Sequence, residues 1–210
     1  MPRTIAIPFA RLGPWLEGFG SRHGETSASG VGDTTVVLTA ADGASATIVV
    51  PFPPLKLQDD PITALTRHLS ASRDVGALLV RKGGYAVGVF SGSQLLVSKV
   101  GSSYVQGKTK AGGWSQQRYA RRRDNQSRKA YQEAADEAAR ILLPHLDTLA
   151  AVATGGDKPA LVAVLADPRL TGVQPLVLPE VHAVPDPRLR VLQAFPELFL
   201  TVRIELNDLA

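Results

Sequence analysis

The sequence predicts an α/β protein with a mixed sheet, and two observations carry this prediction. Short runs rich in β-branched residues, separated by glycine turns, fill much of the first half of the chain. A single long helical pattern follows them, from about residue 115 to residue 143. The chain has 210 residues, of which 44% are apolar and 20% charged, so it can bury a substantial core.

Residues 1–70 predict a small α/β extension. Pro14 suits the first turn of a helix, and the acid pair Asp59–Asp60 suits the start of a second one. Asp42–Gly43 is a hairpin signal between two β-rich runs, whereas residues 24–32 are small and polar and are expected to form a loop. The regular elements expected here are a strand over 4–8, helices over 14–23 and 61–69, and strands over 34–39 and 46–50.

Residues 71–210 predict a second, larger domain. Three strands joined by glycine turns precede the long helix, which Pro144 ends or kinks. Three antiparallel strands, a long helix and a further strand open an RNase H-like domain, and a generic α+β sandwich fits the same pattern. The elements expected after residue 70 are strands over 77–81, 85–90, 94–100, 160–165 and 198–206, and helices over 115–143, 146–152 and 189–195.

Positive charge is concentrated in one short segment. Residues 108–129 contain eight basic residues against the single acid Asp124, which gives this segment a charge of +7. The rest of the chain has 15 basic and 18 acidic residues, a charge of −3. Such a patch is typical of proteins that bind a phosphate backbone, and a solvated helix face is the alternative interpretation. The basic residues are Lys108, Lys110, Arg118, Arg121, Arg122, Arg123, Arg128 and Lys129.

The composition excludes several kinds of chemistry. The chain has no cysteine, which rules out disulfides, thiolate zinc sites, iron–sulfur clusters and a cysteine nucleophile. Its four histidines are widely separated, and neither a metal site nor a cofactor is expected. The sequence shows no apolar run of membrane-spanning length and no secretory signal, so a cytoplasmic location without membrane contact is expected.

A loop with several glycines, residues 101–113, leads into the basic helix. Its glycines allow the backbone to approach a ligand closely. Gly107-Lys108-Thr109 matches the end of a P-loop motif, but Ser102 stands where that motif requires its first glycine, so we reject a P-loop. A flexible loop beside an electropositive helix start can reach a polyanion and place one polar side chain in a narrow site.

The loop and helix carry a family resemblance. Residues 112–123, Gly-Gly-Trp-Ser-Gln-Gln-Arg-Tyr-Ala-Arg-Arg-Arg, resemble the segment of eukaryotic and archaeal peptide-chain release factors that begins Gly-Gly-Gln-Ser and continues Arg-Phe-Ala-Arg. In those factors the Gly-Gly-Gln loop enters the peptidyl-transferase centre, and its glutamine promotes hydrolysis of peptidyl-tRNA. Trp114 stands here in place of that glutamine.

The chain more closely resembles the Vms-like release factors of ribosome quality control, in their bacterial, actinobacterial version. Members of that branch carry the functional glutamine earlier in the loop, often before a glycine and ahead of a basic helix. Gln106-Gly107 matches this arrangement, with a shorter intervening loop. The likeness covers residues 76–165.

The resemblance implies that Gln106 is the functional glutamine, with Gln116 and Gln117 as alternatives. An amide is no useful general base, so its role would be to place a water molecule or the terminal ribose of the tRNA. Without the resemblance, Gln106 is interpreted as an exposed loop residue. Trp114 either stacks on a nucleobase or packs the loop on the domain. The other loop positions of the motif are Gly112 and Gly113.

By this resemblance, the chain would be a ribosome-associated release factor that hydrolyses peptidyl-tRNA on stalled or split large subunits. Its partners would be the peptidyl-transferase centre of the large ribosomal subunit and peptidyl-tRNA, with ribosomal RNA completing the catalytic setting. Two alternatives stay open. One is endonuclease cleavage near the 3′ end of the tRNA, and the other is a non-catalytic ribosome- or RNA-binding protein that uses only the basic helix.

Overall fold

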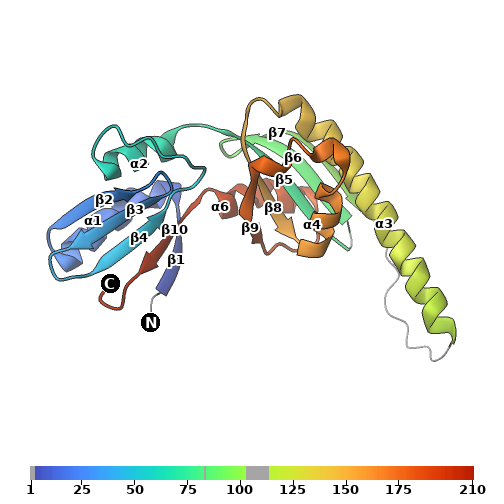
Figure 1. Cartoon of the computed structure of the whole chain (residues 1–210), viewed down its shortest axis with the longest axis horizontal. Helices are drawn as coiled ribbons and strands as arrows, with labels where there is room; N and C mark the ends of the chain where they lie inside the picture. Colours follow the sequence, from blue (N-terminus) through green and yellow to red (C-terminus); the bar gives the residue numbers. More distant parts are fainter. Residues whose placement is uncertain (1–2, 83, 103–113) are drawn as a thin grey trace. The chain divides into compact units, whose positions relative to one another are not determined.

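A computed structural model describes residues 3–82, 84–102 and 114–210, without the side chains of residues 114–127. The chain forms two units, which Figure 1 shows with their element labels. One unit consists of Met1–Ser72 and Glu197–Ala210, and the other consists of Arg73–Pro196. In the described residues each unit has its own five-stranded sheet.

The first unit is an antiparallel sheet packed with helices. Its strands lie in the order β1-β10-β4-β3-β2. Phe19 of α1 and Leu65 of α2 are fully buried, together with Val36, Ile48 and Ile204 of the sheet. The elements are β1 (Arg3–Pro8), η1 (Phe9–Arg11), α1 (Leu12–His23), β2 (Thr26–Val31), β3 (Thr35–Ala40), β4 (Ser45–Val49), α2 (Pro61–Ser70), α6 (Pro196–Phe199) and β10 (Thr201–Leu206).

Most elements of this unit were predicted correctly from local sequence signals. The helix α1 ends before Gly24, which has a φ of 85°, a left-handed conformation that glycine tolerates. The Asp60 carboxylate caps α2 by accepting a hydrogen bond from the backbone N–H of Thr63 at 3.0 Å. The turn between β3 and β4 contains Gly43 with a φ of 88°.

The loop expected over residues 24–32 is instead the strand β2. This strand lies at the sheet edge, and its register runs antiparallel from Thr26 opposite Ala40 to Val31 opposite Thr35. Its side chains are almost all exposed, so backbone pairing rather than alternating burial holds it in place. A strand of this kind lacks the alternation by which sequences reveal strands.

The second unit has the RNase H-like topology. Its sheet order is β7-β6-β5-β8-β9, in which β6 is antiparallel to both neighbours while β8 pairs in parallel with β5 and β9. The predicted mixed α/β fold is therefore confirmed. The elements are β5 (Asp74–Arg81), β6 (Gly84–Ser91), β7 (Gln94–Ser102), α3 (Trp114–Leu142), η2 (Leu143–His145), β8 (Leu149–Gly156), α4 (Lys158–Leu165), η3 (Pro168–Leu170), η4 (Gln174–Leu176), β9 (Val177–His182) and α5 (Leu189–Ala194).

Helices cover both faces of this second sheet. The helices α3 and α4 contact each other and pack on the face that carries Val87 and Val89. The helix α5 packs on β6 and β7, with its Leu192 against Gly88. Because successive strand residues point to opposite faces, Gly88 places α5 on the face away from α3.

Two predicted elements of this unit are wrong in type. Residues 146–152, expected as a helix, lead into the strand β8, and residues 160–165, expected as a strand, belong to the helix α4. The strand β8 lies between two neighbours with both faces covered, so its alanine-rich run shows no alternation. In α4, Leu161 and Val164 are buried while Val162 is 61% exposed, which is a helical pattern too short to recognise in the sequence.

The C-terminal strand also differs from expectation in its place. The strand expected over 198–206 is β10, and it pairs antiparallel with β1 and β4 in the first unit, with Ile204 opposite both Ile5 and Ile48. The second unit therefore ends at Pro196, whereas the sequence predicted a domain over 71–210. Alternating burial of Val202, Ile204 and Leu206 shows what fixes the strand, but it does not reveal in the sequence which sheet receives it.

Candidate functional site

The candidate site lies at one edge of the second sheet. The strands β5, β7 and β8 run in the same direction, so their carboxyl ends meet at this edge. The register pairs Arg81 with Gly84, Gly84 with Ser102, and Val80 with Gly156. Ser102, the last residue of β7, lies at this edge, and the next described residue is Trp114, at the start of α3.

A tyrosine ties the strand before that segment to the helix after it. Tyr85 lies opposite Gly101, and a Cβ on Gly101 would fall 2.5 Å from the Tyr85 Cε1 and hydroxyl oxygen. The ring therefore lies directly over the glycine. The ring belongs to the same buried cluster as Ala134 and Ala138 of α3. Burial raises the pKa of the Tyr85 phenol, and the carboxylates of Glu137 and Glu133 on α3 raise it further.

The second half of α3 is anchored on the sheet. Ala134, Ala138 and Leu142 are fully buried, and Leu142 lies against Gly76 near the opposite edge of the sheet. The helix has 29 residues, about 43 Å at about 1.5 Å per residue. Figure 1 shows its first half extending past the edge where β5, β7 and β8 end.

An ion cluster fixes the anchored half of α3 to the η3 turn. The Nη2 of Arg169 donates to Asp136 Oδ1 at 2.6 Å and to Asp167 Oδ2 at 2.7 Å. These hydrogen bonds lower the pKa values of both carboxyls and raise the pKa of the Arg169 guanidinium. Gln132 also donates to Asp136, at 3.3 Å.

The charges along α3 run against the dipole of the helix. Three of its four acids, Glu133, Asp136 and Glu137, lie in the second half, and the arginines 118, 121, 122 and 123 lie in the first half. A helix is stabilised by the reverse order, because its N-terminus is already positive. The arrangement therefore does not serve helix stability, and it produces a positive end that favours a polyanion.

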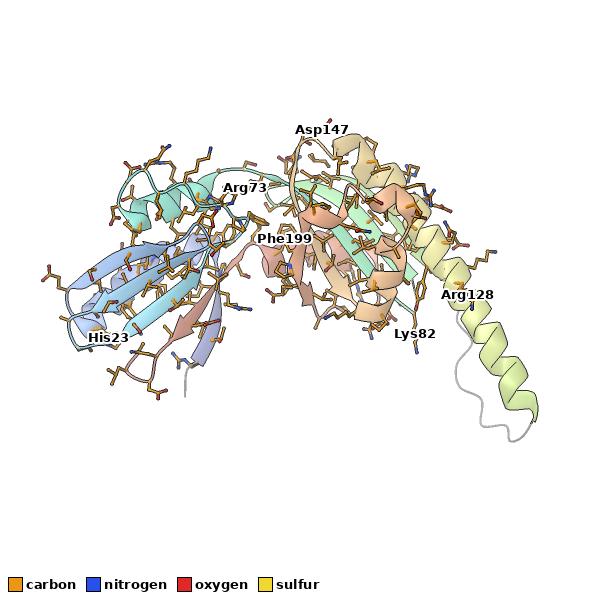
Figure 2. All side chains as sticks on the ribbon, viewed as in Figure 1. His23, Arg73, Lys82, Arg128, Asp147 and Phe199 are labelled. Atoms are coloured by element: carbon orange, nitrogen blue, oxygen red, sulfur yellow. The ribbon has the colours of Figure 1, made fainter. Side chains whose placement is uncertain are left out.

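The structure describes only part of the predicted site. Among the described side chains, Arg128 and Lys129 are exposed, and Figure 2 labels Arg128 on the stretch of α3 that leaves the sheet. Backbone positions in α3 hold Trp114, Gln116, Gln117, Arg118, Arg121, Arg122 and Arg123. Outside the described residues lie Gln106, Lys108, Lys110, Gly112 and Gly113.

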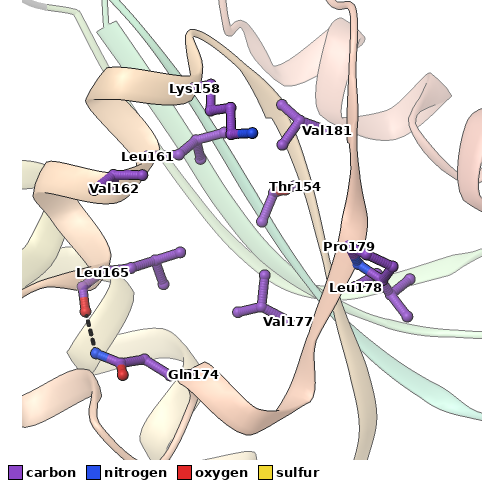
Figure 3. A pocket seen from close by; sticks show the side chains of 10 residues that line it. All are labelled: Thr154, Lys158, Leu161, Val162, Leu165, Gln174, Val177, Leu178, Pro179 and Val181. Atoms are coloured by element: carbon purple, nitrogen blue, oxygen red, sulfur yellow. Dashed lines mark hydrogen bonds between the residues drawn. The ribbon is translucent and has the colours of Figure 1, made fainter.

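A shallow groove lies beside this edge, between α4, η4 and β9, with a volume of about 360 Å³ (Figure 3). Gln174 closes one side by donating from Nε2 to the Leu165 carbonyl oxygen at 2.7 Å. Lys158 is the ionisable residue among those that line the groove, and the remaining lining is mostly apolar. Within the described residues, no three His, Asp or Glu side chains come together as a metal site.

Sequence reasoning did not single out three residues at this edge. Tyr85, Lys82 and Lys158 are distant in sequence from the basic stretch, and only the parallel pairing of β5 with β8 brings the two lysines to the same edge. Their individual neighbourhoods carry no motif.

In the part of the chain that the structure describes, no helix is long and apolar enough to span a membrane.

A mixed α/β unit whose long helix carries a cluster of arginines is typical of proteins that bind a phosphate backbone. The family model described as actinobacteria/chloroflexi VLRF1 release factor matches residues 73–205, which is more than half of the chain. The chain belongs to this release-factor family. The resemblance drawn from the loop and helix is thereby confirmed.

The chain is also similar to a curated peptide chain release factor and, more distantly, to two solved structures. Peptide chain release factor subunit 1 of Thermococcus onnurineus (strain NA1) is 30% identical over 122 residues, covering 53% of this chain and 29% of that protein. The chain thus matches less than a third of that relative's length. The crystal structure of archaeal translation termination factor aRF1 gives a TM-score of 0.48 at 16% identity, covering 80% of this chain and 49% of that one. A second solved structure, of an archaeal protein, gives a TM-score of 0.41 at 16% identity, covering 74% and 47%.

Proposed function

We propose that this release factor frees nascent chains by hydrolysing peptidyl-tRNA on stalled or split large ribosomal subunits in the cytoplasm. Family membership supports a role in release. The observation that carries the proposal is the arrangement at the sheet edge, where residues 103–113 connect β7 to the basic half of α3. The segment contains Gln106, and Tyr85 packs the strand before it, at Gly101, against the second half of α3.

In this proposal Gln106 acts in the peptidyl-transferase centre by holding a water molecule or the terminal ribose of the tRNA. A side-chain amide neither takes up nor supplies a proton at neutral pH, so its contribution is orientation. Ribosomal RNA would supply the remaining groups of the reaction. Gln116 and Gln117 belong to the first turn of α3, which restricts their reach and favours Gln106.

The basic residues supply affinity in this proposal, and the loop supplies chemistry. Lys108, Lys110 and the cations of α3 would neutralise ribosomal RNA phosphates, which explains why the helix tolerates an unfavourable charge order. The planar ring of Trp114 would stack on an unpaired base, such as one near the tRNA 3′ end. Participation in ribosome quality control follows from action on stalled or split subunits.

Purified large subunits that carry peptidyl-tRNA, labelled on both the peptide and the tRNA, test the proposal. The expected result is free peptide and full-length tRNA. Shortened tRNA would instead establish endonuclease action near the 3′ end. Stable binding with neither product would establish a non-catalytic ribosome-binding protein. Because the assay contains no small subunit, a positive result would also show that release needs no codon.

The basic residues are tested in the same assay by Arg121→Glu together with Arg122→Glu. The proposal expects this pair to weaken binding of the subunit strongly, because two phosphate contacts become repulsions. Release should recover when the protein concentration is raised to saturation. Normal affinity in this variant would contradict the role given to α3.

A further inference from the structure

Two lysines outside the basic stretch lie at the same sheet edge as Ser102, the last residue of β7. Lys82 follows directly after β5, and Lys158 is the first residue of α4, two residues after the end of β8. Because β5 and β8 pair in parallel with Val80 opposite Gly156, the two lysines emerge from neighbouring strand ends about 5 Å apart. Both residues are exposed.

The carboxylate of Asp157, the residue before Lys158, already interacts with Arg81 and with the backbone N–H of Lys82. Asp157 Oδ1 lies 3.6 Å from Arg81 Nε, and Asp157 Oδ2 accepts a hydrogen bond from the backbone N–H of Lys82 at 3.3 Å. Arg81 also donates from Nη1 to the Val184 carbonyl oxygen at 3.0 Å. Neither Lys82 nor Lys158 forms an ion pair with any side chain that the structure describes.

This pair of lysines lies close to the carboxyl end of β7. Arg81 is two strands from Ser102, a separation of about 10 Å. Arg128 and Lys129 lie between one and two helical turns before Ala134, which packs in the same buried cluster as Tyr85. Figure 2 labels Lys82 and Arg128 at the same end of the unit.

Stability does not account for these positions. Lys158 places a positive charge at the N-terminus of α4, where the helix dipole disfavours it. Lys82 adds a second unpaired cation beside it, and like charges at neighbouring strand ends repel. The same unfavourable charge order occurs at the start of α3. A polyanion that spans both helix starts would convert both unfavourable arrangements into favourable ones.

We infer that Lys82 and Lys158 form a second contact with RNA phosphates, which continues the basic surface of α3 across the carboxyl ends of β5 and β8. The inference rests on the proposed function, because it names a further part of the surface that would meet ribosomal RNA. Arg81 is a positioning residue in it, since its ion pair with Asp157 keeps that carboxylate from neutralising the lysines.

The inference is tested with the full chain carrying Lys82→Gln and Lys158→Gln. The matched control is Arg188→Gln with Arg190→Gln, which removes two exposed charges at the start of α5, on the opposite face of the sheet. Affinity for purified large ribosomal subunits is measured over a range of salt concentrations. Each phosphate contact contributes about 0.9 to the slope of log affinity against log salt.

The lysine variant should lose about two units of that slope, whereas the arginine control should keep the wild-type slope. Peptide release at saturating protein should equal that of the wild type. Equal slopes in all three proteins, or an equal loss in the control, would overturn the inference while leaving the proposed function intact. Failure of the wild-type protein to bind subunits would overturn both.

Discussion

The contact between Gly101 and Tyr85 makes a quantitative prediction for Gly101→Ala. Gly101 is the residue before the last one of β7, and the ring of Tyr85 occupies the space into which a Cβ would project. The new methyl group would lie 2.5 Å from Cε1 and from the hydroxyl oxygen of the ring. Unstrained carbon contacts begin near 3.5 Å, so the ring must move by roughly 1 Å.

The ring has no room for that movement. Tyr85 is 7% exposed and belongs to the core that includes the fully buried Ala134 and Ala138 of α3. Forcing a side chain into a packed core in this way costs about 1–3 kcal/mol. We therefore expect Gly101→Ala to lower the free energy of unfolding by that amount, and to loosen the tie between β7 and α3.

Urea denaturation followed by circular dichroism measures this loss, and a double-mutant cycle assigns it to the ring. In a Tyr85→Ala background, the clash is gone, so Gly101→Ala should change the free energy of unfolding by less than about 0.5 kcal/mol. An unchanged stability in the single variant would refute the reasoning. A loss that persists without the tyrosine ring would also refute it, because the cause would then lie in the backbone.

Two further predictions concern the anchoring of α3. Arg169 lowers the pKa values of Asp136 and Asp167 below the ordinary 3.8, so this cluster stabilises the fold above about pH 4, and its contribution is lost as the pH falls through the lowered values. Arg169→Gln should therefore flatten the pH dependence of the free energy of unfolding below pH 4, as acid titrations would show. Leu142→Ala should cost about 2–5 kcal/mol by urea denaturation, because the side chain is fully buried. The exposed Leu96→Ala on β7 should cost less than about 0.5 kcal/mol.

Most elements of the fold could be predicted from local signals in the sequence. The glycine turns and β-rich runs of the meander, the long helix before Pro144 and the capping acid Asp60 each act within a few residues, so the sequence alone places them. The errors occur where tertiary contacts decide. Both faces of β8 are covered, so its apolar run shows no alternation, and the side chains of β2 are almost all exposed, so backbone pairing is its main constraint.

The placement of β10 shows a second limit of the sequence. Its alternation predicts a strand, and the strand exists, but it lies between β1 and β4, two strands from much earlier in the chain. The buried residues Val202 and Ile204 select the first unit only because a complementary core is present there. Pairing partners far apart along the chain leave no local trace.

The sequence likewise reveals only part of the candidate site. The basic stretch and its preceding loop are contiguous, so their charge and composition single them out. Lys82 and Lys158 are brought together by β-sheet pairing, and each in isolation resembles an ordinary surface lysine. The family resemblance led to Gln106, since an uncharged loop glutamine has no physical signature of its own.

The central claim is that binding and chemistry reside in different residues, and Gln106→Ala tests it most directly. Single-turnover release is measured on large subunits that carry labelled peptidyl-tRNA, together with the Kd of the variant for the same subunits. The account predicts an unchanged Kd and a release rate at least about 100-fold below that of the wild type. Wild-type release by Gln106→Ala would contradict the account.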